Sequence, residues 1–444
     1  MWLKRLQYGI ISLGPGGIRP TSLRPAVTPI ESFIQKFRKR SHMKRVKWIA
    51  LLPLFLLVPL VIALSSRNSA RNHRIEDLDY ALGNEDAAVR LGAVVSLTEY
   101  GESAVPSLQK ALTDDDPKVK QATVAALGKI GGQEAADALA KVLSDPDRDM
   151  RVRAIVWLGA TGRPALPHLY KALETEPFPR GRMFAAHSIG RLARPGDAPE
   201  ILKRFDKQDA ATQMHLTMAL AKVGDKEAYE GFSRLMESQN KLVRFYVVNA
   251  ITEAGPNKRA LPILTKSLED EAVEVRMWGM FGLEQLKAPE SYPAVVVALN
   301  DVDPYVRKEA AYTLGDIGNR DAVPRLVACL GDPHYLVRAD AAESLGKLGN
   351  EETITVLKPL LCEDSPAVQI KAAEALTRLN DYSGMETLIA TLDSPEALYR
   401  IEASRALQRI SRKDLGTDKQ AWQDWWEQEG KTLTTGSGGE TSDN

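Results

Sequence analysis

The sequence predicts an all-α fold, a right-handed superhelix (α-solenoid) of about eleven stacked helical hairpins. Three observations lead to this prediction. A short pattern recurs about every 31 residues over most of the chain, and its apolar residues follow the period of a helix. The chain also has 444 residues, which is too many for one ordinary compact core. Repetition of a small helical unit accounts for all three.

The recurring pattern is Asp-Pro, a spacer, Val-Arg, small residues and Leu-Gly, as in DPYVRKEAAYTLGDIG from Asp303 and DPHYLVRADAAESLGKLG from Asp332. Alignment on this pattern defines one anchor residue in each of eleven repeats: Arg90, Lys120, Arg151, Arg182, Gln213, Arg244, Arg276, Arg307, Arg338, Gln369 and Arg400. Successive anchors are 30 to 32 residues apart, and the residue seven positions after each anchor is always Leu or Ile. Positions −1, +3, +7 and +10 share one face of a helix, so we expect them to form the core face of each repeat's second helix.

Each repeat begins with a shorter first helix, for example VPSLQKAL from Val105. The Asp-Pro before the second helix suits an N-cap with Pro in the first turn. The Gly after the final Leu suits close packing or helix termination. Because each anchor lies near the Asp of its own or the adjoining loop, we expect a structural ladder of Arg–Asp hydrogen bonds that joins the repeats.

This pattern resembles the HEAT-repeat superfamily, most closely its phycobilisome-lyase-type HEAT-like repeats, over about residues 76–412. The resemblance implies a fold more than an activity, because the branch includes both bilin lyase subunits and many scaffolds. The related deoxyhypusine hydroxylases hold two irons through His-Glu pairs. None of the six histidines here is followed by Glu, so the resemblance does not extend to that iron site.

An apolar run of 17 residues, 48–64 (WIALLPLFLLVPLVIAL), follows a basic N-terminal segment, 1–47. The run meets the lower length limit for crossing a bilayer, and most of the adjacent Lys and Arg precede it. The positive-inside rule then predicts a cytoplasmic N-terminus, with the solenoid on the extracytoplasmic side. The run is either a retained single-pass anchor or the h-region of a signal peptide. In the second case the true start is Met1 or Met43, and the solenoid is secreted or periplasmic after cleavage.

The net charge of zero hides an asymmetry. Residues 1–48 hold eleven Lys/Arg and one acid, and subtracting these from the totals of 58 and 58 leaves 47 basic and 57 acidic residues. The rest of the chain therefore has a net charge of −10, which argues against nucleic acid as the main partner because a phosphate backbone needs a positive surface.

No sequence motif for catalysis is present: the chain lacks a P-loop, a dinucleotide fingerprint, a Gly-x-Ser-x-Gly elbow and a His-Glu-x-x-His helix. We therefore expect no enzyme activity, cofactor or metal site. The two cysteines, Cys329 and Cys362, lie in adjacent repeats. They are either two buried free thiols or one disulfide in an oxidising compartment.

Positions +1, +2 and +5 of the second helix lie outside the core face, and in the central repeats they are rich in Met and aromatic residues. We call the following twelve residues the apolar stripe: Met183, Phe184, His187, Met214, His215, Met218, Phe245, Tyr246, Met277, Trp278, Phe281 and Tyr312. In the HEAT-repeat superfamily, which this sequence resembles, the second helices line the concave face. The stripe is then either a partner-binding surface, with Trp278 at its centre, or a set of side chains buried by irregular packing between repeats.

The leading functional hypothesis is a non-enzymatic protein-interaction scaffold or assembly factor whose protein partner docks on the stripe. The alternative is a bilin-lyase-like or chaperone-like protein that cradles a hydrophobic small ligand. After the last repeat, Trp422, Trp425 and Trp426 share one face of a short helix within residues 413–429, which we expect to cap the open end of the array. Residues 430–444 have the composition of a disordered tail.

Overall fold

A computed structural model describes residues 68–363 and 365–432. The chain divides into two compact units, Met1–His73 and Arg74–Asn444. The predicted basic segment 1–47 and apolar segment 48–64 lie outside the described residues, as do residues 433–444 of the predicted tail. Within the described ranges no helix combines the length and the apolar character that a membrane span requires.

Every regular element of the described residues is helical, which confirms the predicted all-α solenoid of eleven hairpins. The first helices are residues 68–81, α5 (Val105–Ala111), α7 (Gly132–Val142), α9 (Leu166–Thr175), α11 (Ala198–Phe205), α13 (Lys226–Leu235), α15 (Leu261–Ser267), α17 (Tyr292–Ala298), α19 (Val323–Cys329), α21 (Glu351–Leu357) and α23 (Met385–Thr391). The second helices are α4 (Ala87–Thr98), α6 (Pro117–Ile130), α8 (Arg148–Leu158), α10 (Pro179–Leu192), α12 (Ala210–Val223), α14 (Lys241–Ala254), α16 (Val273–Leu286), α18 (Pro304–Ile317), α20 (Tyr335–Leu348), α22 (Pro366–Arg378) and α24 (Ala397–Ser411).

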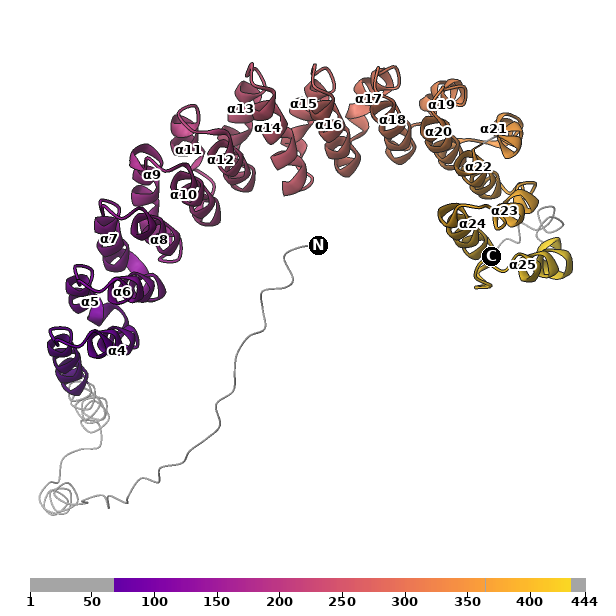
Figure 1. Ribbon diagram of the computed structural model, residues 1–444. Coiled ribbons are helices and arrows are strands. Elements are labelled where there is room, and N and C mark those ends of the chain that lie inside the picture. Colours follow the sequence, from indigo (N-terminus) through magenta and orange to yellow (C-terminus); the bar gives the residue numbers. More distant parts are fainter. Residues whose placement is uncertain (1–67, 364, 433–444) are drawn as a thin grey trace, which may run out of the picture. The chain divides into compact units, whose positions relative to one another are not determined.

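Short 3₁₀ helices complete several hairpins. Five of them lead directly into a first helix: η1 (Gly101–Ala104), η2 (Arg163–Ala165), η3 (Lys258–Ala260), η4 (Pro289–Ser291) and η5 (Arg320–Ala322). A sixth, η6 (Lys358–Cys362), follows α21. Within residues 74–432 the second helices form the inner side of the curved row and the first helices form its outer side (Figure 1). The inner surface is therefore built from consecutive second helices, which pack directly on one another.

The Asp-Pro motif starts second helices as predicted in repeat eight. Asp303 is the N-cap of α18, its carboxylate accepts from the Tyr305 N–H at 2.8 Å, and Pro304 occupies the first turn. In repeat nine the prediction is wrong, because α20 begins two residues after the motif and its N-cap is His334. Asp332 instead corresponds to Asp301, the residue six positions before the anchor of repeat eight.

The core confirms the predicted helix face. All eleven Leu and Ile residues at position +7, from Leu97 to Leu407, are buried. The glycine that follows this position permits close approach of the next repeat. A Cβ on Gly128 would lie 2.4 Å from the Trp157 ring, and one on Gly346 would lie 2.5 Å from the Ala375 backbone. Close packing is thus the role of these two glycines.

The predicted Arg–Asp ladder is present, and at six of the eleven anchors it has two parts. The anchor Arg276 donates from Nε and Nη2 to the Asp301 carboxylate of the next loop, at 2.7 and 2.8 Å. Its Nη1 donates to the Asp270 carbonyl of its own loop at 2.9 Å. The same bidentate pairing to the next loop's carboxylate occurs at five further anchors: Arg90, Arg151, Arg244, Arg307 and Arg338. These arginines are occupied structurally and are not free to bind a partner.

The last repeat is covered by α25 (Lys419–Trp425) and a π-helical turn (Trp426–Gly430). Trp422 is fully buried, its Nε1–H donates to the Gly416 carbonyl at 2.9 Å, and its ring meets Trp425 edge to face. Together with Trp426 these rings pack on buried residues of the last repeat, such as Leu407. They remove from water the apolar surface that an open-ended array would expose.

Candidate partner-binding surface

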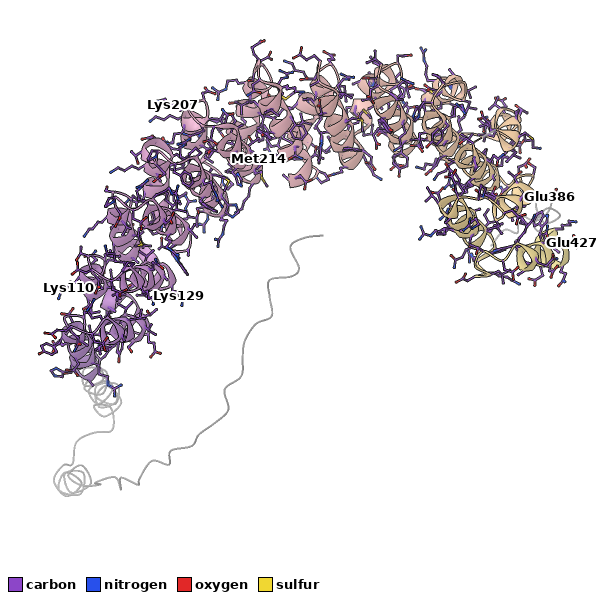
Figure 2. The ribbon with its side chains drawn as sticks, viewed as in Figure 1. Lys110, Lys129, Lys207, Met214, Glu386 and Glu427 are labelled. Atoms are coloured by element: carbon purple, nitrogen blue, oxygen red, sulfur yellow. The ribbon has the colours of Figure 1, made fainter. Side chains whose placement is uncertain are left out.

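The apolar stripe lies on five consecutive second helices, α10, α12, α14, α16 and α18. Figure 2 shows Met214 on the inner side of the row, opposite the outer residue Lys207. None of the twelve stripe residues is fully buried. His187 and Met218 are exposed, with Met218 at 50%, and the other ten are half-buried. The stripe is therefore neither a free patch nor part of the core, which is an intermediate outcome between the two predicted alternatives.

Aromatic contact explains much of this partial burial. The Trp278 ring meets Phe245 edge to face at a centroid distance of 6.1 Å and meets Phe281 at 5.9 Å. Phe245 in turn contacts Tyr246 at 5.9 Å. Phe184, Phe245, Met277 and Trp278 also pack against the main core. The cluster thus spans α14 and α16 with one side on the core and the other side facing out.

A pocket of about 520 Å³ opens between α10, α12 and α14. His187, His215 and Met218 line it, together with Arg191 and Lys222. The two imidazole rings meet edge to face at 5.8 Å. His215 Nδ1 lies 2.9 Å from the Ala211 carbonyl and donates to it. Burial lowers the pKa of His187, and the charges of His215 and Arg191 lower it further.

Beyond repeat seven the inner positions carry charges that neutralise one another. Lys308 pairs with Asp340, Lys347 pairs with Asp316 and Glu343, and Lys371 pairs with Glu343. Arg409 continues the series by pairing with Glu374. Burial raises the pKa of Asp340 despite Lys308, whereas hydrogen bonds from Lys371 and Lys347 outweigh burial and lower the pKa of Glu343. Much of this half of the inner surface is therefore an ion-pair network.

The sequence analysis missed part of this surface because it compared only positions +1, +2 and +5, and only in the central repeats. Val95 and Val156 occupy position +5 in repeats one and three and are 61% and 43% exposed. They extend the exposed apolar positions toward the N-terminal repeats. Arg191 and Lys222 lie at position +9, outside the compared set, yet they line the same pocket as the histidines. Period alone would have found them, since +5 and +9 are four residues apart.

Among the described residues no three His, Cys, Asp or Glu side chains are grouped so that they could hold a metal ion. Cys329 and Cys362 are free thiols. The expectation that both are buried is wrong for Cys362, which is exposed at the end of η6, whereas burial raises the pKa of Cys329 to about 11.

The family model of HEAT repeats matches residues 75–158, 137–211, 198–284 and 292–366, which together make up more than half of the chain. The chain belongs to the HEAT-repeat family. The narrower phycobilisome-lyase type stays a prediction. The comparison with curated proteins finds no match.

Among solved structures the HEAT-repeat chain is similar to the karyopherin Kap121p bound to the extreme C-terminus of the protein phosphatase Cdc14p, with 16% identity and a TM-score of 0.54. That match covers 76% of this chain and 45% of the karyopherin. Kap121p bound to Pho4p matches at 15% identity and a TM-score of 0.54, covering 81% of this chain and 46% of the other. The HEAT-repeat chain thus spans less than half the length of these proteins, and the likeness shows a shared fold.

Proposed function

We propose that this HEAT-repeat protein is a non-enzymatic scaffold or assembly factor that binds a protein partner on the apolar stripe. The observation that carries the proposal is the partial burial of the stripe residues together with their ring contacts. Large apolar side chains are half-buried and held by ring contacts, yet they face the inner surface. Because these side chains are already ordered before binding, each of them loses less conformational entropy when a partner binds. Aromatic residues held in this way are typical of binding hot spots.

The contrast along the inner surface supports the same proposal. Equivalent positions in repeats nine to eleven hold charges such as Glu343, Lys371 and Glu402, so the repeat architecture does not require aromatic residues there. Proteins of the same fold bind protein segments, as the Kap121p complexes with Cdc14p and Pho4p illustrate.

We further propose that residues 48–64 place the repeats at a membrane or carry them across one, with the solenoid on the extracytoplasmic side. The support is the basic segment 1–47 before the apolar run. A reporter enzyme that is active only in the cytoplasm, fused after residue 412, should give no signal. Activity of that reporter would refute the proposed location without affecting the proposed binding surface.

A photo-activatable cross-linking amino acid tests the binding surface. We would place it at position 218 or 281 on the inner surface, and at position 297 or 302 as controls. Val297 and Val302 are 70% and 90% exposed but do not belong to the stripe. The proposal predicts one protein that cross-links from the inner positions and not from the control positions. Cross-linking of equal yield from all four positions would argue that the stripe has no special role.

The pocket beside His187 is the one observation that favours the alternative of a hydrophobic small ligand. Its volume of about 520 Å³ lies in the range of small-molecule sites. Mass spectrometry of the protein purified from its own cells, under non-denaturing conditions, would reveal a stoichiometric small molecule in that case. The scaffold proposal predicts none.

A further inference from the structure

We propose that the segment bound along repeats two to seven is acidic as well as apolar, so that carboxylates of the partner meet cations beside the stripe. This inference rests on the proposed binding surface and names the chemistry of its occupant. Its basis is an uneven distribution of charge along the inner helices of the described residues.

The inner helices of repeats two to five hold ten cations and one carboxylate. Helices α6, α10 and α12 contain no acidic residue, and α8 contains only Asp149, in its first turn. Arg151 and Arg182 are used by the ladder, where they bind Glu176 and Asp209. The remaining inner surface therefore has a positive field that the chain itself does not neutralise.

Three exposed cations are the clearest members of this set: Lys129, Arg153 and Arg191. No ion pair joins any of them to a carboxylate in the part of the chain that the structure describes. Figure 2 shows Lys129 on the inner side, opposite Lys110 on the outer side. A fourth cation, Lys222, donates to the Gly190 and Arg191 carbonyls and covers the C-terminal end of α10. We call Lys129, Arg153 and Arg191 the open cations.

The open cations alternate with exposed apolar groups. Arg153 is followed three residues later by Val156 on the same helix face, and Arg191 follows His187 by four residues. Arg191 also shares a pocket with Met218. The only carboxylate that lines this pocket is Glu253, from repeat six. A segment in which Asp or Glu alternates with large apolar residues complements this surface, whereas a basic segment would meet repulsion.

The charges of the C-terminal repeats also favour the N-terminal and central repeats as the site of an acidic segment. Most of their inner charges already have partners, as in Lys371 with Glu343 and Arg409 with Glu374. Arg378 and Arg405 are exposed and form no ion pair with the described residues. A charged segment gains little there, because it would have to displace existing ion pairs. Repeats two to five thus favour the carboxylates of a bound segment. Repeats four to seven favour its apolar side chains, because α14 and α16 carry Glu253, Glu274 and Glu284. Neighbouring helices lie about 8–10 Å apart, so six repeats span roughly 40–50 Å, the length of about 14 extended residues.

Selection from a phage library of random 16-residue peptides, on the immobilised full chain in mild detergent, tests the inference. We expect enrichment of peptides that combine Asp or Glu with Trp, Phe or Leu. Synthetic copies of these peptides should bind about tenfold more weakly to the triple variant Lys129→Gln/Arg153→Gln/Arg191→Gln. Their binding should also weaken when the salt concentration rises from 50 to 300 mM, because the Debye length then falls about 2.4-fold.

A matched control removes the same charge from the outer side. Lys141, Lys171 and Lys203 are exposed on α7, α9 and α11, and the variant Lys141→Gln/Lys171→Gln/Lys203→Gln should bind the peptides as the natural chain does. Equal weakening in both triple variants would show a diffuse charge effect and overturn the inference.

Further outcomes separate this inference from the proposed function. Enriched peptides that are neutral or basic, but whose binding is lost in Phe281→Ser, would overturn the acidic occupant and retain the stripe as a binding surface. Peptides that bind independently of Phe281 and Met218 would overturn both. Absence of any enriched peptide would also overturn the inference. Tighter binding of a 16-nucleotide RNA or of vesicles rich in phosphatidylserine than of any peptide, independent of Phe281, would assign the cations to a different class of partner.

Discussion

Phe245 and Trp278 meet edge to face across two neighbouring repeats, with ring centroids 6.1 Å apart and ring planes at 86°. Phe245 belongs to α14 and Trp278 to α16, so this contact joins two second helices at the inner surface. Both rings also pack on the core. The two rings at the centre of the stripe therefore stabilise the packing of neighbouring repeats, and they also belong to the proposed binding surface.

Replacement of Trp278 by Ser should therefore lower the free energy of unfolding by about 2 kcal/mol, less than the 3–5 kcal/mol of a fully buried large aromatic residue. In a double-mutant cycle, Phe245→Ala and Trp278→Ala should show a coupling of about 0.5–1.5 kcal/mol. Urea denaturation of the four proteins measures both values. A coupling near zero would mean that the ring contact adds nothing beyond burial.

The Arg–Asp ladder should be a large contributor to stability. The side chains of Arg244 and Asp270 are 8% and 6% exposed and share two hydrogen bonds. Asp270→Ala leaves the buried Arg244 without its main partner and should cost about 3 kcal/mol. Glu230→Ala breaks the exposed pair with Lys226 and should cost less than about 0.5 kcal/mol. Equal losses in the two variants would contradict a structural role for the ladder.

The same carboxylates predict acid sensitivity. Burial alone would raise the pKa of Asp270, but hydrogen bonds from Arg244 and from the Ala272 N–H lower it below the ordinary value of 3.8. The pKa values of Asp114, Glu176, Asp209 and Asp332 are lowered in the same sense. A lowered pKa in the folded state stabilises it above the ordinary value of the carboxyl, and this contribution is lost as pH falls through the lowered pKa.

Urea denaturation between pH 7 and pH 2.5 should accordingly show a flat stability down to about pH 5 and a steep loss below about pH 4. Asp270→Asn should be less stable than the natural chain at pH 7, with a shallower loss below pH 4. The two buried carboxyls whose pKa values burial raises, Glu309 and Asp340, act in the opposite sense and reduce the total slope. A stability that rose with acidification below pH 4 would contradict the assignment.

The tryptophan cap should be required for the last repeats. Trp422→Ala removes a fully buried ring and its hydrogen bond to Gly416, and should cost about 3–5 kcal/mol. Because each repeat of a solenoid is stabilised by its nearest neighbours, the loss of stability should be greatest at the C-terminal end. Hydrogen exchange should show faster exchange in α23 and α24 and unchanged exchange in α6 to α10. A uniform change along the chain would indicate one fully cooperative unit instead.

Much of the fold follows from period and packing, which a sequence shows directly. The Leu and Ile at +7 are buried in all eleven repeats because they lie on the face that a 3.6-residue period defines. The start of α20 was misplaced because repeat nine has two more residues between its Asp-Pro and its anchor than repeat eight has. Turn geometry, rather than the motif itself, decides which Asp becomes the N-cap.

The candidate site was less accessible to sequence reasoning. The half-burial of Trp278 depends on how closely α14 and α16 approach each other. A local sequence pattern does not predict that distance. Inner ion pairs such as Lys371 with Glu343 and Arg409 with Glu374 join residues 28 and 35 positions apart, so only a stacked array brings them together. The pocket beside His187 likewise needs three repeats at once.

The most direct test of the binding surface is the affinity of the cross-linked partner, once identified, for the variant Met218→Ser/Phe281→Ser. Neither side chain is part of the main core, so the variant should melt close to the natural chain. We predict a loss in binding of about 2 kcal/mol, roughly thirtyfold in Kd, while the control Val297→Ser binds normally. An unchanged Kd for the double variant, with the protein folded, would contradict the claim that the partner docks on the apolar stripe.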